Sequence, residues 1–250
     1  MKKLIVICLL ILFICVPIIH AQFMADLESG LNLSGYNDVR VPGKTGTPFS
    51  LTDIGSNMSL YFRAKFNYTL AERHTFSILL APFTKTYKGK FDYDITDFAG
   101  QNYSAIHEVK AKYKFDSWRL SYRWDFINSK HFQIGVGLTG MIRDAKICIK
   151  GQDNLGTVVE SSKSNVGFLP LINFLFVWKF TPCMDLRIEG DAIVTPHGRA
   201  EDIFFGWTGC ISDRVSMKLG YRFLEGGVDK DPVYNYAQFH HIVFGLMFRI

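Results

Sequence analysis

The chain has 250 residues, a formal net charge of +5 and an aromatic content of 15%, and its mean hydropathy is only +0.09. That hydropathy is low for a helical membrane protein, and no segment after residue 22 supplies the ~20 continuous apolar residues that a membrane-spanning helix needs. The mild charge and the lack of a basic run argue against a nucleic-acid partner.

The first segment has the layout of a secretory signal. Two lysines precede an apolar run at 4–19, and Ala21 supplies a small residue at the expected cleavage position. We therefore predict a cleaved signal peptide at 1–21 and one mature domain at 22–250. An uncleaved membrane helix is the alternative, because the apolar run is long for a signal.

Residues 58–70 show the pattern that recurs through the rest of the chain. Apolar and polar side chains alternate there with a period of two, which indicates a strand with one apolar and one polar face. Thirteen residues is long for a soluble strand but suits a tilted strand that crosses a bilayer. Behind a secretory signal, such strands predict an all-β fold: a closed antiparallel transmembrane β-barrel with lipid outside and a polar lumen.

Ten segments carry the alternation, so we predict ten strands, with eight or twelve as the alternatives. An even number leaves both ends of the chain on the periplasmic side. The expected strands are 23–35, 58–70, 75–86, 104–127, 132–150, 165–180, 184–195, 202–212, 215–223 and a last strand that ends at Ile250. Long polar segments at 37–56, 87–103 and 151–164 are the expected external loops.

The strand expected at 104–127 changes its pattern midway. Apolar residues alternate with lysines over 109–115, on odd numbers, whereas after Asp116–Ser117 the apolar residues fall on even numbers. One extra residue moves every later side chain to the other face, so a β-bulge or a hairpin at Asp116–Ser117 explains the change. A hairpin puts the long loop at 151–164 on the periplasmic side, where turns are short, so we favour the bulge.

The C-terminal strand carries a separate signal. Its apolar side chains share one face, at Ile242, Phe244, Leu246, Phe248 and Ile250. A final amphipathic strand of this kind resembles the signature that the barrel-assembly machinery reads, although a terminal Phe is more usual than Ile250. We therefore expect that machinery as a partner. Aromatic residues also gather beside the expected periplasmic turns, where an interfacial girdle belongs.

Short motifs fall in the expected external loops and turns. They are Asn37-Asp38-Val39, Pro42-Gly43, Gly46-Thr47, Phe49-Ser50-Leu51, Pro196-His197-Gly198-Arg199-Ala200 and Leu224-Glu225-Gly226-Gly227. With these motifs the mature chain resembles, over most of its length, a sparsely described group of Gram-negative outer-membrane β-barrel proteins. The resemblance implies a barrel fold and a location in the outer membrane, and it implies no activity.

Charged residues on the expected inner face form the first candidate site. The basic candidates are Arg63, Lys110, Lys112, Lys114, Arg123, Arg143, Arg187 and Arg222, with Lys65, Arg119 and Lys218 on the same face. The opposing acids are Glu189 and Asp191, together with Asp26, Glu28, Glu108, Asp125 and Asp202. The set predicts either an anion-preferring pore or a salt-bridged plug. We favour the plug, because about ten strands leave little lumen and buried charges must be paired.

The external rim is the second candidate site. The residues expected to hold a ligand there are Asn37, Asp38, Arg199, Glu201, Asp202 and Glu225. They fall near the upper ends of the first, seventh, eighth and ninth strands, which form one arc of a closed barrel. We expect Arg199 to form a buried ion pair with Glu201, Asp202 or Glu225.

An enzymatic alternative uses the same rim. His197 could act as a general base beside Glu201, Asp202 or Asp231 in a surface hydrolase that acts on lipid or peptide. The sequence matches no motif of such enzymes, and a tight turn with solvated charges explains the same residues. We therefore expect no catalytic residue, and the hydrolase stays as the alternative.

We expect no cofactor and no metal. Cys148, Cys183 and Cys210 are odd in number and widely spaced, which argues against a disulfide framework and a zinc site, so we interpret them as free thiols. His107 and the pair His240–His241 lack a third ligand at a useful spacing.

The expected function is that of an integral outer-membrane barrel with a structural, ligand-binding or weakly conducting role. A small molecule at the outer mouth is an expected partner. Outer-membrane lipid and lipopolysaccharide are others, because cations in or near the external loops can pair with phosphates. Those cations are Arg40, Lys44, Lys85, Lys88 and Lys90. Plain solvated loop charges are the alternative.

Overall fold

The computed structural model describes residues 21–55 and 58–250, and the regular structure in these ranges is all β-strand. The expected signal peptide, apart from Ala21, falls on residues outside that description. Within the described ranges, no helix is long and apolar enough to cross a membrane.

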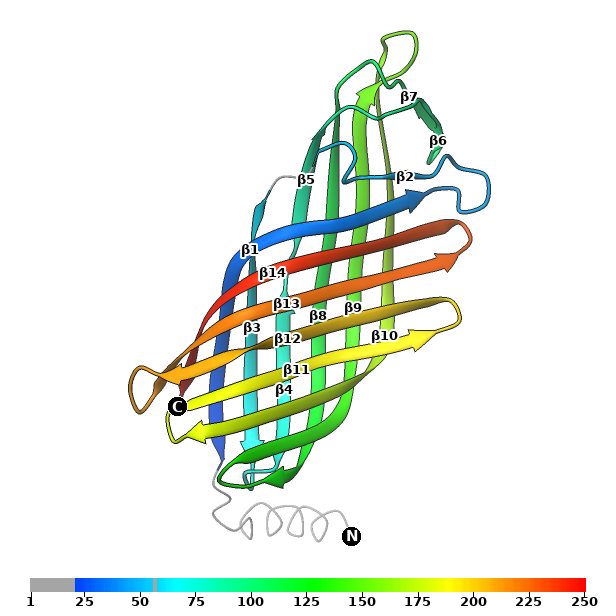
Figure 1. Cartoon of the computed structure of the whole chain (residues 1–250). Helices are drawn as coiled ribbons and strands as arrows, with labels where there is room; N and C mark the ends of the chain where they lie inside the picture. Colours follow the sequence, from blue (N-terminus) through cyan, green and yellow to red (C-terminus); the bar gives the residue numbers. More distant parts are fainter. Residues whose placement is uncertain (1–20, 56–57) are drawn as a thin grey trace, which may run out of the picture.

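Fourteen strands make up the described structure, and ten of them form the wall of a barrel (Figure 1). The wall strands are β1 (Gln22–Arg40), β3 (Ser59–Leu70), β4 (His74–Ala81), β8 (Val109–Asn128), β9 (Phe132–Gln152), β10 (Val158–Thr181), β11 (Met184–Thr195), β12 (Gly198–Cys210), β13 (Val215–Lys230) and β14 (Val233–Arg249). The short strands toward the external end are β2 (Phe49–Ser50), β5 (Thr84–Gly89), β6 (Ile95–Phe98) and β7 (Gln101–Tyr103).

The wall closes because the last strand pairs with the first. β14 lies antiparallel to β1 along the register from Met24–Arg249 to Arg40–Tyr234. Each of the other wall strands pairs with the wall strands that come before and after it in the chain. The short strand β5 also pairs with β8, next to β4. The prediction of a closed, ten-stranded antiparallel barrel is therefore confirmed.

β8 is one continuous strand without the bulge that the sequence predicts. Its pairing with β9 keeps one register from Lys110 to Trp124, and odd-numbered side chains are the buried ones along nearly all of this stretch. The bulge predicted at Asp116–Ser117 is therefore wrong. Lys110, Lys112 and Lys114 all face outward, so the prediction that they line the lumen is wrong as well.

The pattern of β8 changes because its surroundings change along its length. In the lower part, the outward side chains of Trp118 and Leu120 are apolar and exposed, while the inward Arg119 is buried. In the upper part, the outward side chain at Lys110 is charged, while the inward Tyr113 packs in an apolar core. The lower part thus suits lipid outside and ions inside, and the upper part suits water outside and an apolar interior. Both faces exchange polarity without any change of register.

An apolar core fills the external end of the barrel. It packs the short strands and loops of that end against the upper parts of β8, β9 and β14. Its fully buried members include Leu51, Tyr87, Ile95, Phe98, Tyr103, Ala111 and Ile149. These side chains give the loops a hydrophobic anchor that a polar lumen could not supply.

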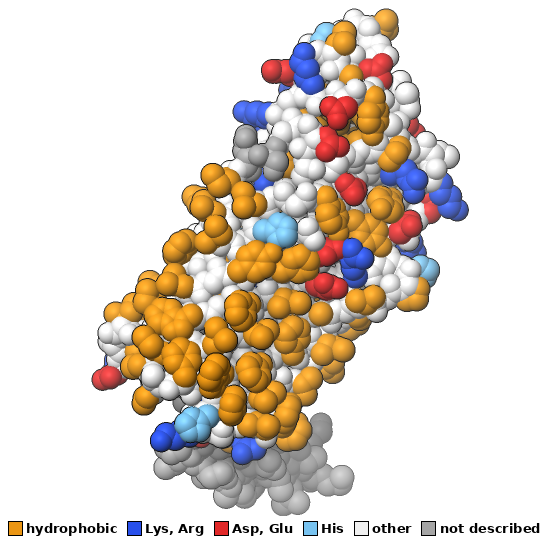
Figure 2. All heavy atoms as spheres, viewed as in Figure 1, with side chains coloured by type: hydrophobic (Ala, Val, Ile, Leu, Met, Phe, Trp, Pro, Cys, Tyr) orange, Lys and Arg blue, Asp and Glu red, His pale blue; other side chains and the backbone are white. Residues whose placement is uncertain are grey.

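An exposed apolar belt surrounds the lower part of the barrel, and Figure 2 shows the part of it on one face. Its large members include Leu60, Phe62, Ile78, Leu120, Leu138, Phe168, Ile172 and Phe244. Near the lower turns the belt ends in exposed aromatic side chains, among them Tyr68, Phe76, Trp124, Phe126, Phe132, Trp178 and Phe180. A bilayer covers a surface of this kind in barrels that cross membranes.

Several strands extend further than the alternation predicts. β1 continues to Arg40 through a register shift between Ser34 and Tyr36, which moves its inward positions from even to odd numbers. β9 and β10 stay paired up to Gln152 and Val158, so the loop expected at 151–164 shrinks to a short turn.

Candidate functional site

Ten charged side chains meet inside the barrel and form one connected network of ion pairs. Five are basic and five are acidic, so the network is neutral when every member is ionised. The members are Arg63, Lys65, Arg119, Lys218 and Arg222, with Asp26, Glu28, Glu189, Asp191 and Asp202. Most come in pairs two residues apart on one strand, because that spacing places both side chains on the inner face.

Asp202 is the centre of the outer half of the network. Its carboxylate accepts hydrogen bonds from Arg63 Nη1 at 2.8 Å and from Arg222 Nη1 at 2.7 Å. Arg119 Nη2 lies 2.7 Å from the same carboxylate, and Arg119 Nη1 donates to Asp191 at 2.7 Å. All of these side chains are buried, so salt in the surrounding water screens their attraction only weakly.

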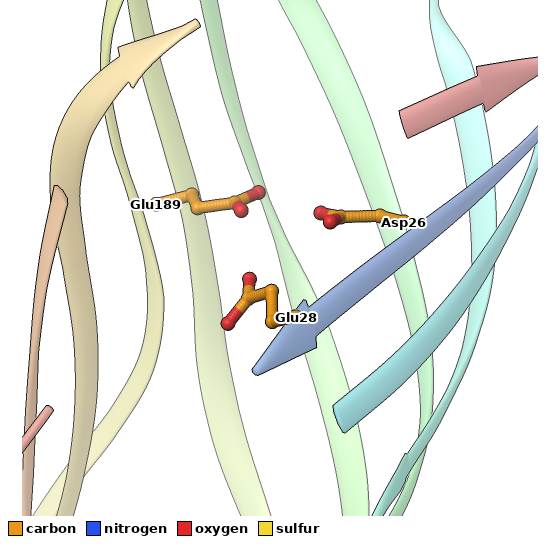
Figure 3. Close-up of side chains that lie close together, drawn as sticks. All are labelled: Asp26, Glu28 and Glu189. Carbon is orange, nitrogen blue, oxygen red and sulfur yellow. The ribbon is translucent and has the colours of Figure 1, made fainter. Parts of the chain in front are cut away.

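Lys218 is the centre of the other half of the network. Figure 3 shows that the carboxylates of Asp26, Glu28 and Glu189 converge on one point from β1 and β11. Three acids at this spacing could hold a metal ion. Here the ammonium of Lys218 lies among them and donates to Asp26 at 3.0 Å, Glu28 at 2.5 Å and Glu189 at 2.7 Å. Its three hydrogens match the three acceptors, which gives the acidic cluster a structural explanation.

Other candidate lumen residues lie away from this network. Arg123 pairs with Asp125 at 2.6 Å near the lower turns. Arg187 lies 3.6 Å from Asp185 and lines the lower end of the lumen. The predicted lumen residues in the lower part of the barrel are therefore paired with opposite charges.

The network divides the lumen into two cavities. The outer cavity has a volume of about 750 Å³ and lies between the upper parts of β8 to β10 and those of β11 to β14. The lower cavity, near the chain ends, has a volume of about 580 Å³. Between them, among the network residues, there is room for only about 20 Å³. A solute in the outer cavity therefore meets a floor of buried ion pairs.

The walls of the outer cavity are mainly apolar. Tyr113, Met141, Leu171 and Phe239 are buried side chains that border it, and Ile193 borders it from β11. Its floor is polar, because Arg119, Asp191 and Asp202 border it from below. An apolar chamber with a few polar groups is the usual make-up of a small-molecule site, and its size falls within the ~300–1,000 Å³ of such sites.

The barrel wall has a notch beside this cavity. β10 pairs with β9 from Val158 onward, but it pairs with β11 only from Ile172. In Figure 1, β8 to β10 continue to the external end while β11 to β14 turn away from them. Six consecutive residues at 166–171 border the cavity, although their side chains alternate between the two faces. The cavity therefore reaches the strand edge itself.

Arg143 is an inward-facing cation of the outer cavity that has no acidic partner. Its Nη2 donates to Asn165 Oδ1 at 3.0 Å, whereas its Nε is buried without a hydrogen-bond partner. No carboxylate of the described residues forms an ion pair with it, in contrast to Arg119 on the floor of the same cavity. Arg143 is half-buried, and a charge partly removed from water without a partner is costly, so this guanidinium is suited to an external anion.

The fold, rather than the sequence, links this chain to known proteins. No family model matches the sequence, and no curated protein matches it. Among solved structures, the outer membrane protease OmpT from Escherichia coli matches with a TM-score of 0.54 at 8% identity, over 92% of this chain and 97% of that one. The chain has the fold of an outer-membrane β-barrel.

Other solved structures match this fold more loosely. The attachment invasion locus protein Ail of Yersinia pestis has 10% identity and a TM-score of 0.39, over 91% of this chain and 99% of that one. The outer membrane protein OprG from Pseudomonas aeruginosa has 11% identity and a TM-score of 0.37, over 93% and 97%. At these identities the likeness extends to the fold and not to the side chains of any site.

The residues expected to form one ligand-binding rim are divided between two faces of the wall. Asn37 is buried inside, where Asn235 Nδ2 donates to its Oδ1 at 3.1 Å, and Asp202 belongs to the ionic network. Asp38, Arg199, Glu201 and Glu225 occupy outward positions. The predicted single rim cluster is therefore wrong, because alternate residues of these strands face opposite sides.

Arg199 does form an ion pair, and its partner is Glu225. The expectation that this pair is buried is wrong, since 43% of the Arg199 side chain is exposed. The hydroxyl of Tyr36 also donates to Glu225, and the guanidinium of Arg199 lies over the ring of Tyr236. This outward group lies above the belt, and Arg199 and Glu225 border the outer cavity from β12 and β13.

The residues of the hydrolase alternative all border the outer cavity, but in the described ranges no interaction joins them there. His197 and Asp231 are exposed on two different external turns, Glu201 faces outward, and Asp202 is held by three arginines inside. No hydrogen bond or ion pair of the described residues joins any two of these four side chains. The geometry gives His197 no carboxylate to orient it, so it does not favour the hydrolase.

No pattern in the sequence predicts the outer cavity or the notch. Both depend on where β11 stops pairing with β10, which no local pattern encodes. One signal for the apolar chamber was present in the odd-numbered apolar residues at 109–115, next to outward lysines. These residues face the interior and not lipid, which is opposite to the side that the alternation predicts.

Proposed function

We propose that this protein is an integral barrel of a Gram-negative outer membrane that binds a small molecule in its outer cavity and does not conduct ions. The observation that carries the proposal is the neutral network of ten buried charges, which forms a floor beneath an apolar chamber of about 750 Å³. Side chains fill the interior of small barrels in this way, and a chamber above such a floor can hold a ligand without leaking it.

The proposed location rests on two features. The exposed apolar belt with its aromatic lower edge suits a bilayer, and the solved structures of like fold include outer membrane proteins of Gram-negative bacteria. The proposed partners follow from this location. They are the barrel-assembly machinery through β14, outer-membrane lipid around the belt, and lipopolysaccharide phosphates at exposed loop cations such as Lys44, Lys88 and Lys90. Lys85 is excluded from that set because it is buried inside.

Conductance in a planar bilayer tests the closed lumen. The wild-type barrel should show no steady conductance above leak. A matched variant, Arg119→Ala with Asp191→Ala, removes one cation and one anion, so the network stays neutral while a path opens between the two cavities. That variant should conduct. Steady openings of the wild-type protein would overturn the closed barrel.

Saturable binding tests the ligand site. The barrel in phosphatidylcholine vesicles is titrated with neutral, cationic and anionic amphiphiles, and binding is measured by isothermal calorimetry against protein-free vesicles. At least one class should bind with a stoichiometry near one per barrel. Simple partition into lipid for every class would overturn the ligand-binding proposal.

A further inference from the structure

We propose that the outer cavity holds an anionic amphiphile with a single aliphatic chain, whose head pairs with Arg143 and whose chain lies along the apolar walls. This inference rests on the proposed function and adds the chemical class of the ligand and its route. Three independent features of the cavity support it: an unpaired cation, an apolar wall and a notch toward the bilayer.

The head group is inferred from the charge balance. Arg143 lies on β9 and borders the cavity, and Asn165 is its only hydrogen-bond partner among the described residues. The acids of the floor cannot serve it, because Asp191 and Asp202 already accept from arginines of the network. Of the other carboxylates that border the cavity, Glu225 pairs with Arg199, and neither Glu201 nor Asp231 forms an ion pair with Arg143. Lys163, two residues before Asn165, borders the same cavity and adds positive charge. A carboxylate or phosphate head would neutralise this part of the wall through charge-assisted hydrogen bonds.

The chain is inferred from the apolar wall. The buried side chains of Tyr113, Met141, Leu171 and Phe239 border the cavity from four different elements of the barrel. A small inorganic anion would leave these surfaces without an apolar partner. A single alkyl chain would cover them and would gain the free energy of apolar burial. The volume of about 750 Å³ suits one chain with its head rather than a whole two-chain phospholipid.

The route is inferred from the notch. Its β10 lip carries Val166 and Phe168, whose side chains are 68% and 70% exposed, and its β11 lip carries Val194 at 72%. Phe168 is paired in register with Ile142, an outward residue of the apolar belt. The notch therefore opens at the upper edge of the belt, where an amphiphile in the outer leaflet could pass sideways into the chamber. The unpaired edge of β10 is tolerated there because it lines a cavity.

Photolabelling tests the site. The barrel in phosphatidylcholine vesicles is irradiated with hexadecanoate that bears a diazirine on its chain, and the labelled peptides are identified by mass spectrometry. Saturable labelling is expected at Met141 and Leu171. Unlabelled hexadecanoate should displace the probe, whereas hexadecyltrimethylammonium of equal chain length and inorganic phosphate should not.

Two variants test the head group. Arg143→Met removes the unpaired charge and should weaken binding of the probe about tenfold or more, as loss of a charged hydrogen bond does. Lys150→Met is the matched control, because Lys150 lies on the same strand but is exposed on the outer face. It should bind as the wild type does. Arg143→Met should also unfold at a denaturant concentration no lower than the wild type, since it removes an uncompensated, half-buried charge.

Each outcome decides a different point. Equal binding by both variants, or displacement by the cationic amphiphile, would overturn the anionic head and leave the ligand-binding cavity in place. Displacement by inorganic phosphate would overturn the amphiphile in favour of a simple anion site. Labelling confined to belt residues such as Leu138 would overturn the inference and the proposed cavity function together.

Discussion

Replacing Asp202 by asparagine should destabilise the barrel more than any comparable change on its surface. Asp202 accepts from Arg63 at 2.8 Å and Arg222 at 2.7 Å, and it lies 2.7 Å from Arg119. The substitution leaves the network with five cations and four anions. Arg63 would keep only Glu28, whose carboxylate is 3.7 Å from its Nε. Breaking a buried pair by removing one partner costs ~3–5 kcal/mol, so we expect a loss of that size in the free energy of unfolding.

Urea titration of the barrel in lipid vesicles measures this loss, with tryptophan fluorescence as the signal. The matched control is Asp144→Asn, because Asp144 is an outward acid whose side chain is 37% exposed and whose partner Lys114 also contacts Asp116. The free energy of unfolding of Asp144→Asn should fall by only about 0–1 kcal/mol. Adding Arg63→Met to Asp202→Asn restores four charges of each sign and should recover most of the stability. Equal losses for Asp202→Asn and Asp144→Asn would refute the neutral network.

Three further predictions test the facing and the register of the strands. Leu219→Arg puts a charge on the outward face and should cost ~2–4 kcal/mol near the middle of the bilayer, whereas Ser216→Arg points into the lower cavity and should cost less in the same urea titration. Lys112→Cys is made in a Cys148→Ser background, because Cys148 lies opposite residue 112 in the β8–β9 register. It should react with a membrane-impermeant maleimide in intact cells, whereas a lumenal position, as the sequence predicted, would leave it unlabelled. Cys210 N–H donates to the carbonyl of Cys183 at 2.9 Å. The Cα atoms of residues that face each other in this way lie ~5.5 Å apart, which is within the reach of a disulfide bond. Mild oxidation should therefore join the two exposed thiols within one chain. Failure to form this disulfide would contradict the register of β11 and β12.

The sequence predicted the barrel well because its strands repeat one simple rule. Over 58–70 the period of two, the length and the polarity of each face all indicate a strand between lipid and a polar interior. The rule also identified most of the network, since Arg63, Glu189 and Arg222 alternate with outward neighbours on parts of their strands that lie within the belt. Lumen charges there are paired because burial without a partner is costly.

The rule failed where the surroundings of a strand change. Along β8 the same odd-numbered positions face an ionic lumen at Arg119 and an apolar core at Tyr113. Alternation reports which residues share a face and not which solvent that face meets. The sequence therefore gave the correct period over 109–115 and the wrong side. The prediction that Asn37 and Asp38 share one rim failed for another reason. A register shift after Ser34 sets which of the two faces inward, and the residue types give no sign of that shift.

The candidate site could not be predicted from the sequence for a topological reason. The outer cavity combines Tyr113 on β8, Arg143 on β9, Leu171 on β10 and Phe239 on β14. Their proximity depends on the tilt of the strands and on the point where β11 leaves β10. Arg143 was identified as an inward cation, but its lack of an acidic partner is visible only when its neighbours are placed in space.

The ionic network also bears on how the barrel is assembled. Lys218 and Arg222 reach Asp26 and Glu28 across separations of 190 to 194 residues in the chain. A partial sheet of β1 to β12 holds five acids of the network against three of its cations, and that excess stays uncompensated until β13 joins the sheet. A half-built sheet would have to hold those carboxylates at membrane depth, where a charge without a partner is strongly disfavoured. Arrival of the last hairpin then neutralises the interior and seals the seam between β14 and β1 in the same step, so insertion and closure should proceed as one cooperative event.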